Sequence, residues 1–191
     1  TNGSLLSDKV VEQINSAENI SKINISIDGA TKEVFEKIRI RSNFDLIVEN
    51  TKKLIDTIKL KKIRPTISAL SLIQKENFHQ TKEIMYLCKE LGFDNLSYQV
   101  QMTGWGKKDW EKNNKKQDIN YNYKSYSHFF KEIIDEARSL NFKVKIIDSN
   151  LLSFDKQCSY PWDTPYVNTE GRVTPCCMIP DPNVEELGNI N

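Results

Sequence analysis

The stretch Lys22–Gly29, KINISIDG, decides the fold class of this chain. Isoleucines at positions 23, 25 and 27 alternate with Asn24, Ser26 and Asp28, and a period of two predicts a β-strand with one apolar and one polar face. Gly29 ends the strand. Two runs with helical spacing follow it, the first after Thr31 and the second after Asn43. The stretch therefore predicts a strand followed by helices, with a strand that is apolar on one side only.

The same strand–helix order recurs along the chain. Further strands are predicted over residues 66–73, 96–102 and 142–147, and helices over residues 77–91 and 126–140. A helix after Ser7 precedes the first strand, and residues 103–124 are predicted to form a polar loop around Trp105 and Trp110. Strands that alternate with helices predict a parallel sheet with right-handed crossovers, hence an α/β fold.

Polar strand faces favour one kind of parallel sheet over the other. A strand covered by helices on both sides should be apolar on both faces, yet the first strand and the one containing Gln99 and Gln101 each have a polar face. Such strands suit a barrel wall with helices outside and a wet lumen inside, here the later part of a TIM-like (β/α)6 barrel. A flavodoxin-like sheet is the alternative, because strand ends at a switch point also carry polar groups.

Composition excludes several classes of function. The 191-residue chain has a formal net charge of +1, which indicates neither nucleic acid nor an anionic membrane as partner. No apolar run approaches the ~20 residues of a membrane span. Four cysteines, two of them adjacent, favour a reducing, cytoplasmic compartment and metal binding over disulfides. The opening TNGSLL and the final LGNIN are typical of the interior of a domain, so we expect an internal segment of a longer protein.

Three of the four cysteines lie within residues 158–177, CSYPWDTPYVNTEGRVTPCC. Short strands at 166–168 and 172–174, with a turn at 169–171 in which Gly171 is free to take a positive φ, predict a β-hairpin. The hairpin would bring Cys158 back towards Cys176, and thiolates gathered in this way commonly hold zinc or an iron–sulfur cluster. The sequence therefore predicts a metal site here.

At several separate places the sequence resembles the radical SAM enzymes that carry a C-terminal SPASM extension. TNG at residues 1–3 is similar to the turn after the third barrel strand, and SIDGATKEVFEKIR, residues 26–39, to the fourth strand and its helix. NFDLIVENTKKL, Asn77 and CKELGFDNL, residues 88–96, resemble the parts that follow. Cys158, twelve residues, Gly171, four residues and Cys176 resemble the opening of the SPASM pattern. The family's CxxxCxxC loop and the later SPASM cysteines are not in this chain.

The resemblance implies a fold, an activity and cofactors. Residues 1–150 would be the later part of the radical SAM barrel, and residues 151–191 the start of the SPASM domain. In the family a [4Fe–4S] cluster, reduced by an electron donor, gives an electron to S-adenosylmethionine (SAM), and the resulting radical takes a hydrogen atom from a peptide, a protein or a small molecule. The catalytic cluster would lie outside this chain, so no catalytic residue is assigned within it.

The resemblance also implies roles for particular residues in the lumen. Ser26 and Asp28 would contact the ribose or methionine part of SAM, although Asp28 would otherwise cap the turn at Gly29. Arg39 would pair with the SAM carboxylate, or else be a solvated helix arginine. Gln99 and Gln101 would line the adenine side, or pack against other lumen side chains. Asn77 is predicted to begin a helix as a cap, in a capping box with Gln80.

The cysteines carry the auxiliary-cluster prediction. Cys158 and Cys176 would be ligands, with Cys177 either a third ligand or a packing or substrate-facing residue, since adjacent side chains diverge. Cys88 lies on the apolar face of a predicted helix and is expected in the core. Two alternatives stay open: a zinc-stabilised α/β binding module without radical chemistry, and a degenerate homologue without a cluster.

Overall fold

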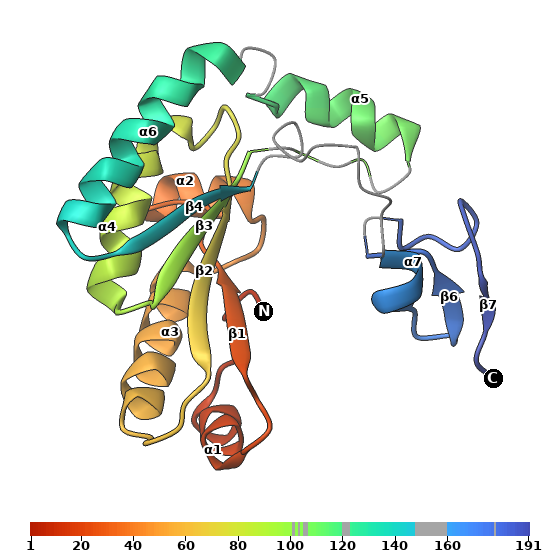
Figure 1. Ribbon diagram of the computed structural model, residues 1–191, viewed down its shortest axis with the longest axis horizontal. Coiled ribbons are helices and arrows are strands. Elements are labelled where there is room, and N and C mark those ends of the chain that lie inside the picture. Colours follow the sequence, from red (N-terminus) through yellow and green to blue (C-terminus); the bar gives the residue numbers. More distant parts are fainter. Residues whose placement is uncertain (101, 103, 105–106, 120–122, 148–159, 178) are drawn as a thin grey trace. The chain divides into compact units, whose positions relative to one another are not determined.

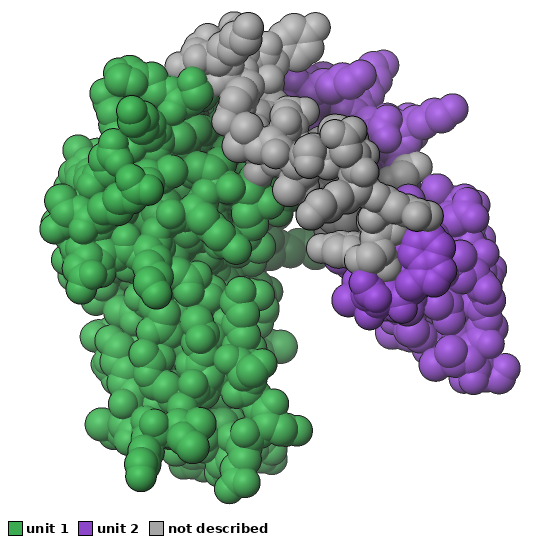
Figure 2. All heavy atoms as spheres, in the orientation of Figure 1, with its two compact units in different colours: residues 1–100, 119–147 green, residues 101–118, 148–191 purple. Residues whose placement is uncertain are grey.

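The computed structural model describes residues 1–100, 102, 104, 107–119, 123–147, 160–177 and 179–191. The chain divides into two compact units (Figure 2). Unit 1 comprises residues 1–100 and 119–147, and unit 2 comprises residues 101–118 and 148–191. The expected boundary near residue 150 stays a prediction about domains.

Unit 1 is built on a parallel sheet of four strands: β1 (Lys22–Ser26), β2 (Thr66–Leu72), β3 (Asn95–Gln99) and β4 (Lys143–Ile147). They lie side by side in chain order, β1-β2-β3-β4. Right-handed crossovers between sequential neighbours place all the connecting helices on one face of a sheet. A flavodoxin-like sheet needs a reversal of strand order, and the described strands contain none. The prediction of an α/β fold with a parallel sheet is confirmed.

The connecting helices lie to one side of this sheet (Figure 1). They are α2 (Lys32–Ile38), α3 (Phe44–Lys59), α4 (Thr81–Leu91) and α6 (Tyr123–Ser139), and the short 3₁₀ helix η1 (Phe78–Gln80) precedes α4. Helix α1 (Asp8–Ser16) precedes β1 and packs against α3. Asn43 begins α3 as predicted, since its side-chain oxygen accepts a hydrogen bond from the Leu46 N–H at 3.0 Å. Gly92 ends α4 with a φ of 91°.

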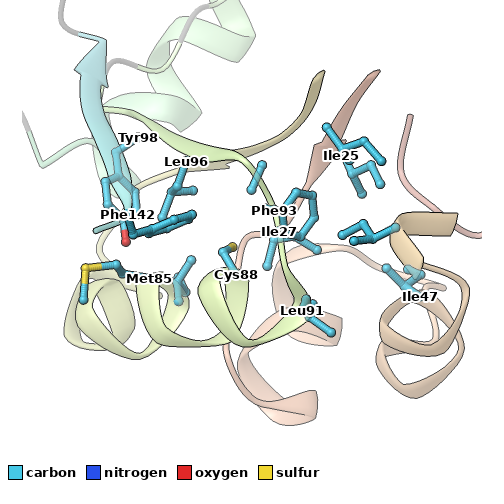
Figure 3. Close-up of a cluster of buried hydrophobic side chains, with 14 of the residues drawn as sticks. Ile25, Ile27, Ile47, Met85, Cys88, Leu91, Phe93, Leu96, Tyr98 and Phe142 are labelled. Atoms are coloured by element: carbon cyan, nitrogen blue, oxygen red, sulfur yellow. The ribbon is translucent and has the colours of Figure 1, made fainter. Parts of the chain in front are cut away.

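The apolar strand face packs against these helices in one core. The core contains Ile25 from β1, Ile27 just after β1, and Leu96 and Tyr98 from β3, all fully buried with side chains from α4 (Figure 3). Cys88 lies among them, as expected, and its burial raises the pKa of the thiol above its usual range. The Tyr98 hydroxyl donates to the Thr81 carbonyl, which ties β3 to the start of α4.

The other sheet face is mostly polar, as the alternation in the sequence predicts, although Leu70, Leu72 and Ile147 also lie on it. Ser26 lies opposite Leu70, Leu70 opposite Ser97, and Ser97 opposite Lys145 in the strand register. Asn24 and Lys145 on this face are exposed, whereas their apolar neighbour Ile25 is buried. One helix-covered face and one polar face are what a barrel wall requires.

Unit 2 contains helix α5 (Lys108–Gln117), the single turn α7 (Tyr160–Asp163) and a small antiparallel sheet. The sheet has strands β5 (Tyr166–Val167), β6 (Arg172–Thr174) and β7 (Gly188–Asn189) in the order β5-β6-β7. Tyr166 pairs with Thr174, and Gly171 turns the chain with a φ of 77°. The predicted hairpin is therefore confirmed, and β7 adds a strand that the sequence did not indicate.

Helix α5 corrects the prediction of a polar loop over residues 103–124. None of its residues is buried, so it has no apolar periodicity to read. Its stability has other sources: Asp109 and Glu111 occupy the first turn and Lys115 and Lys116 the last, which complements the helix dipole. Trp110, which the sequence places in the predicted loop, is 51% exposed on this helix. Within the described residues no helix is both long and apolar enough to cross a bilayer.

Candidate functional site

The carboxyl end of β1 carries a buried ion pair. Asp28 follows the strand by two residues and is 4% exposed. Its Oδ2 accepts a hydrogen bond from Arg39 Nε at 2.7 Å and lies 2.6 Å from Arg39 Nη2 in an ion pair. Its Oδ1 accepts the backbone N–H of Leu72 at 2.8 Å, which joins the end of β1 to the end of β2. Thus Asp28 binds across the sheet rather than capping its own turn.

Burial and pairing act in opposite directions on this carboxylate. Burial raises the pKa of Asp28 above its ordinary value, while the charge of Arg39 and the hydrogen bonds from Leu72 and Arg39 lower it, and burial has the larger effect. Arg39 ends α2 and its side chain is 28% exposed. Its contacts to Asp28 use Nε and Nη2, and Nη1 makes no hydrogen bond to the residues that the structure describes, so its two N–H groups can bind a further acceptor.

A polar pocket of about 410 Å³ opens beside this pair. Asn2 and Ser4 line it from the start of the chain, where Ser4 donates to the Asn2 side chain at 2.8 Å. Arg41 lines it from the segment after α2 and has a φ of 67°, a left-handed conformation that is uncommon for a residue other than glycine. Carboxylate, guanidinium, amide and hydroxyl groups together suit a ligand that carries both charges and hydroxyls.

The loop after β1 is fixed from a distance by the segment after β2. Asn77 is fully buried, and its Nδ2 donates to the carbonyls of Asp28 at 2.8 Å and Leu72 at 3.0 Å. Gln80 accepts the Ala30 N–H at 2.9 Å and donates to the Thr31 hydroxyl at 2.9 Å. The predicted capping box is therefore wrong, because both side chains bind residues 28–31 instead of the start of α4. Sequence reasoning missed this role, since the partners lie about fifty residues away.

Gly29 completes the packing of this loop. A Cβ at this position would come within 2.7 Å of the Phe35 backbone nitrogen, so the loop can lie against α2 only if the residue has no side chain.

The structure brings some of the predicted lumen residues together and not others. Asp28 and Arg39 meet in the pocket, but as each other's partners. Ser26 is half-buried at the end of β1 and does not line the pocket. Gln99 is half-buried at the end of β3, and β2 separates its strand from β1. Gln101 lies outside the described residues, so the adenine-side prediction for the two glutamines stays a prediction.

The cysteine region of unit 2 presents two thiols. Cys176 is half-buried and Cys177 is exposed, just after β6. Cys177 lines a hollow of about 650 Å³ with residues from two segments of the unit, namely Lys107, Trp110, Tyr166, Pro180, Asp181 and Pro182. Cys158 lies outside the described residues. Among the residues that the structure does describe, no cluster of three or more histidine, cysteine or acidic side chains forms a metal site. The described thiols alone therefore do not make a complete cluster site.

The fold resembles that of solved structures. Two crystal structures of Streptococcus suis SuiB match, one bound to S-adenosylmethionine (TM-score 0.65, 12% identity) and one bound to the precursor peptide SuiA (TM-score 0.62, 12% identity). The matches cover 98% and 93% of this chain but only 44% and 42% of the SuiB chains. Models of known protein families give no match, and neither do the curated protein sequences. At this identity the likeness shows a shared α/β fold.

Proposed function

We propose that this chain is the part of a radical SAM/SPASM enzyme that contains the later strand–helix units of its barrel and the start of its auxiliary-cluster domain, and that the enzyme acts on a peptide. The observation that carries the proposal is the fold likeness, over 98% of the chain, to a protein crystallised with S-adenosylmethionine. The structure of the same protein with a precursor peptide supports a peptide substrate over a small molecule.

The sheet supports the barrel assignment. Four parallel strands in chain order, with helices on one side and mostly polar side chains on the other, are compatible with an arc of barrel wall that further strands would extend. The Thr1 carbonyl accepts the Ser26 N–H at 3.1 Å, and the Thr1 amino group donates to the Asn24 carbonyl at 2.8 Å. Residue 1 thus begins to extend the sheet at the β1 edge.

The pocket beside Asp28 is the proposed SAM site. SAM carries a carboxylate, an ammonium group and ribose hydroxyls, and the pocket offers the charged and hydrogen-bonding partners that these need. In this proposal Arg39 Nη1 binds the SAM carboxylate, and Asp28 orients Arg39 for it. A [4Fe–4S] cluster would be held by a CxxxCxxC loop outside this chain, and it would supply the electron for the cleavage of SAM. The protein orients the ligand and excludes water from it.

The auxiliary cluster is the less complete part of the proposal. Cys176 would be a ligand with Cys158, and the remaining ligands would come from Cys177 or from residues outside this chain. Two described thiols do not fit a four-ligand cluster by themselves, so no step of the reaction is assigned to it.

Metal content separates this proposal from a zinc-stabilised binding module. The full-length protein, purified without oxygen, is expected to contain iron and inorganic sulfide in equal amounts. Reconstitution with iron and sulfide should raise both to whole clusters. A colourless protein that binds zinc and takes up no iron would contradict the proposal and favour the binding module.

A further inference from the structure

We propose that Asn77 and Gln80 are positioning residues for the pocket beside Asp28, and that they act by holding the loop of residues 28–31 in its ligand-binding shape. The inference rests on the proposed function for the identity of the ligand, SAM. It adds two residues that do not line the pocket themselves and do not bind the charged atoms of the ion pair.

Asn77 and Gln80 together form what we call the clamp, and both polar atoms of the Asn77 side chain are hydrogen-bonded. The Asn77 amide uses both sides: Oδ1 accepts the Gln74 N–H at 2.8 Å, and Nδ2 donates to the Asp28 and Leu72 carbonyls. Both carbonyl partners belong to residues that are themselves joined by the Asp28 carboxylate and the Leu72 N–H. One buried side chain therefore fixes the main chain on both sides of the bond that holds the Asp28 carboxylate.

Gln80 holds the other end of the 28–31 loop. Gln80, which is 8% exposed, binds Ala30 and Thr31, and Thr31 precedes the first residue of α2. Arg39 directly follows helix α2, and its guanidinium binds the Asp28 carboxylate. The loop and helix α2 are therefore held at two places. The Asp28–Arg39 ion pair joins their ends, and the side chains of Asn77 and Gln80 bind the loop between them.

The clamp should raise the affinity of the pocket for SAM. A ligand that binds a mobile loop must order it, and that cost is subtracted from its binding free energy. Without the clamp, Asp28 and Arg39 would keep their charged groups, but these groups would no longer be held in one position in the pocket. We therefore expect variants that lack the clamp to bind SAM more weakly, with a smaller effect on the stability of the rest of the sheet.

The variants can separate the bonds. Asn77→Asp keeps the acceptor for the Gln74 N–H and removes the donor to Asp28 and Leu72. Gln80→Met removes both of its bonds, whereas Gln80→Glu keeps the acceptor for Ala30, and the Thr31 hydroxyl can donate to the new carboxylate. Asp94→Ala is the matched control. Asp94 also joins strands, by accepting the Ile67 N–H at 2.8 Å and pairing with Arg64 at 2.7 Å, but it lies at the amino end of the sheet.

The experiment measures SAM affinity by calorimetry on the full-length protein, together with hydrogen exchange of the Leu72 amide without ligand. Asn77→Asp and Gln80→Met should weaken binding by about tenfold or more, which corresponds to about 1.4 kcal/mol, and should speed exchange at Leu72. Gln80→Glu should restore most of the affinity, and Asp94→Ala should bind SAM as the wild type does even though it unfolds more easily.

Two results would overturn the inference: unchanged affinity and unchanged Leu72 exchange in Asn77→Asp and Gln80→Met, or an equal loss of affinity in Asp94→Ala. If the wild type itself binds no SAM, the proposed function fails, and Leu72 exchange alone then decides whether Asn77 and Gln80 position Asp28.

Discussion

Replacing Arg39 with methionine should destabilise unit 1 by about 3–5 kcal/mol at neutral pH, because it leaves a buried carboxylate without its partner. The Asp28 side chain is 5% exposed, so water cannot replace the lost guanidinium. The change should also make stability depend on pH. Arg39 is one of the groups that lower the pKa of Asp28, so its loss lets burial raise that pKa further.

The sign of the pH effect follows from linkage. An aspartate whose pKa is higher in the folded state than in the unfolded state supports folding fully below the unfolded value, about 3.9, and loses that support as pH rises through the folded value. Arg39→Met should therefore recover stability in acid. The double variant with Asp28→Asn should be more stable than Arg39→Met alone at neutral pH, because the uncharged amide still accepts from Leu72.

Hydrogen exchange of β1 and β2 amides in the full-length protein, at several pH values and corrected for intrinsic rates, measures this free energy. Lys52→Met is the matched control. Lys52 pairs with Asp56 at 3.2 Å on the surface, with side chains 50% and 54% exposed, so little change is expected. Opening energies in Arg39→Met that equal those of the wild type and do not vary with pH would contradict the role given to the pair.

Replacing Cys176 with alanine should remove one iron–sulfur cluster from the full-length protein while leaving SAM cleavage partly intact. The expected loss is about four iron atoms per chain if the auxiliary cluster is of the [4Fe–4S] type. Iron and sulfide analysis measures it directly. SAM cleavage should partly remain because the catalytic cluster would be held by a different loop, outside this chain.

Cys88 provides the control for that measurement. Cys88→Ala removes a fully buried core thiol in unit 1, so it should lower stability and leave the iron content unchanged. Cys177→Ser tests the exposed neighbour, which shares the same strand end but presents its thiol to solvent. Iron content in Cys176→Ala equal to that of the wild type would refute the auxiliary-site assignment.

The sequence could predict the sheet because its signal is local. Alternation in Lys22–Ser26 and helical spacing after Asn43 each follow from which side of one element is buried. The order of the elements then restricts the topology, because sequential parallel strands require crossovers. The hairpin around Gly171 was equally readable, since a short turn between two strands needs a residue that tolerates a positive φ.

Hydrogen bonds and ion pairs between residues far apart in the sequence could not be predicted from such local patterns. Asn77 was expected to cap a helix, because asparagine in that pattern commonly does, whereas its partners are the Asp28 and Leu72 carbonyls. Arg39 and Asp28 were each expected to bind a ligand, and only the fold shows that they bind each other. Helix α5 was not predicted because it has no buried face and therefore no apolar periodicity. Its charges, acidic in the first turn and basic in the last, favour the helix instead.

Under the proposed function, the protein cleaves SAM reductively. The most direct test is to incubate the anaerobically prepared full-length protein, with its clusters reconstituted, with SAM and a strong one-electron reductant, and to quantify 5′-deoxyadenosine and methionine. The account predicts that both products form in equal amounts and only when reductant is present. SAM that stays intact in a protein with a full complement of iron and sulfide would contradict it.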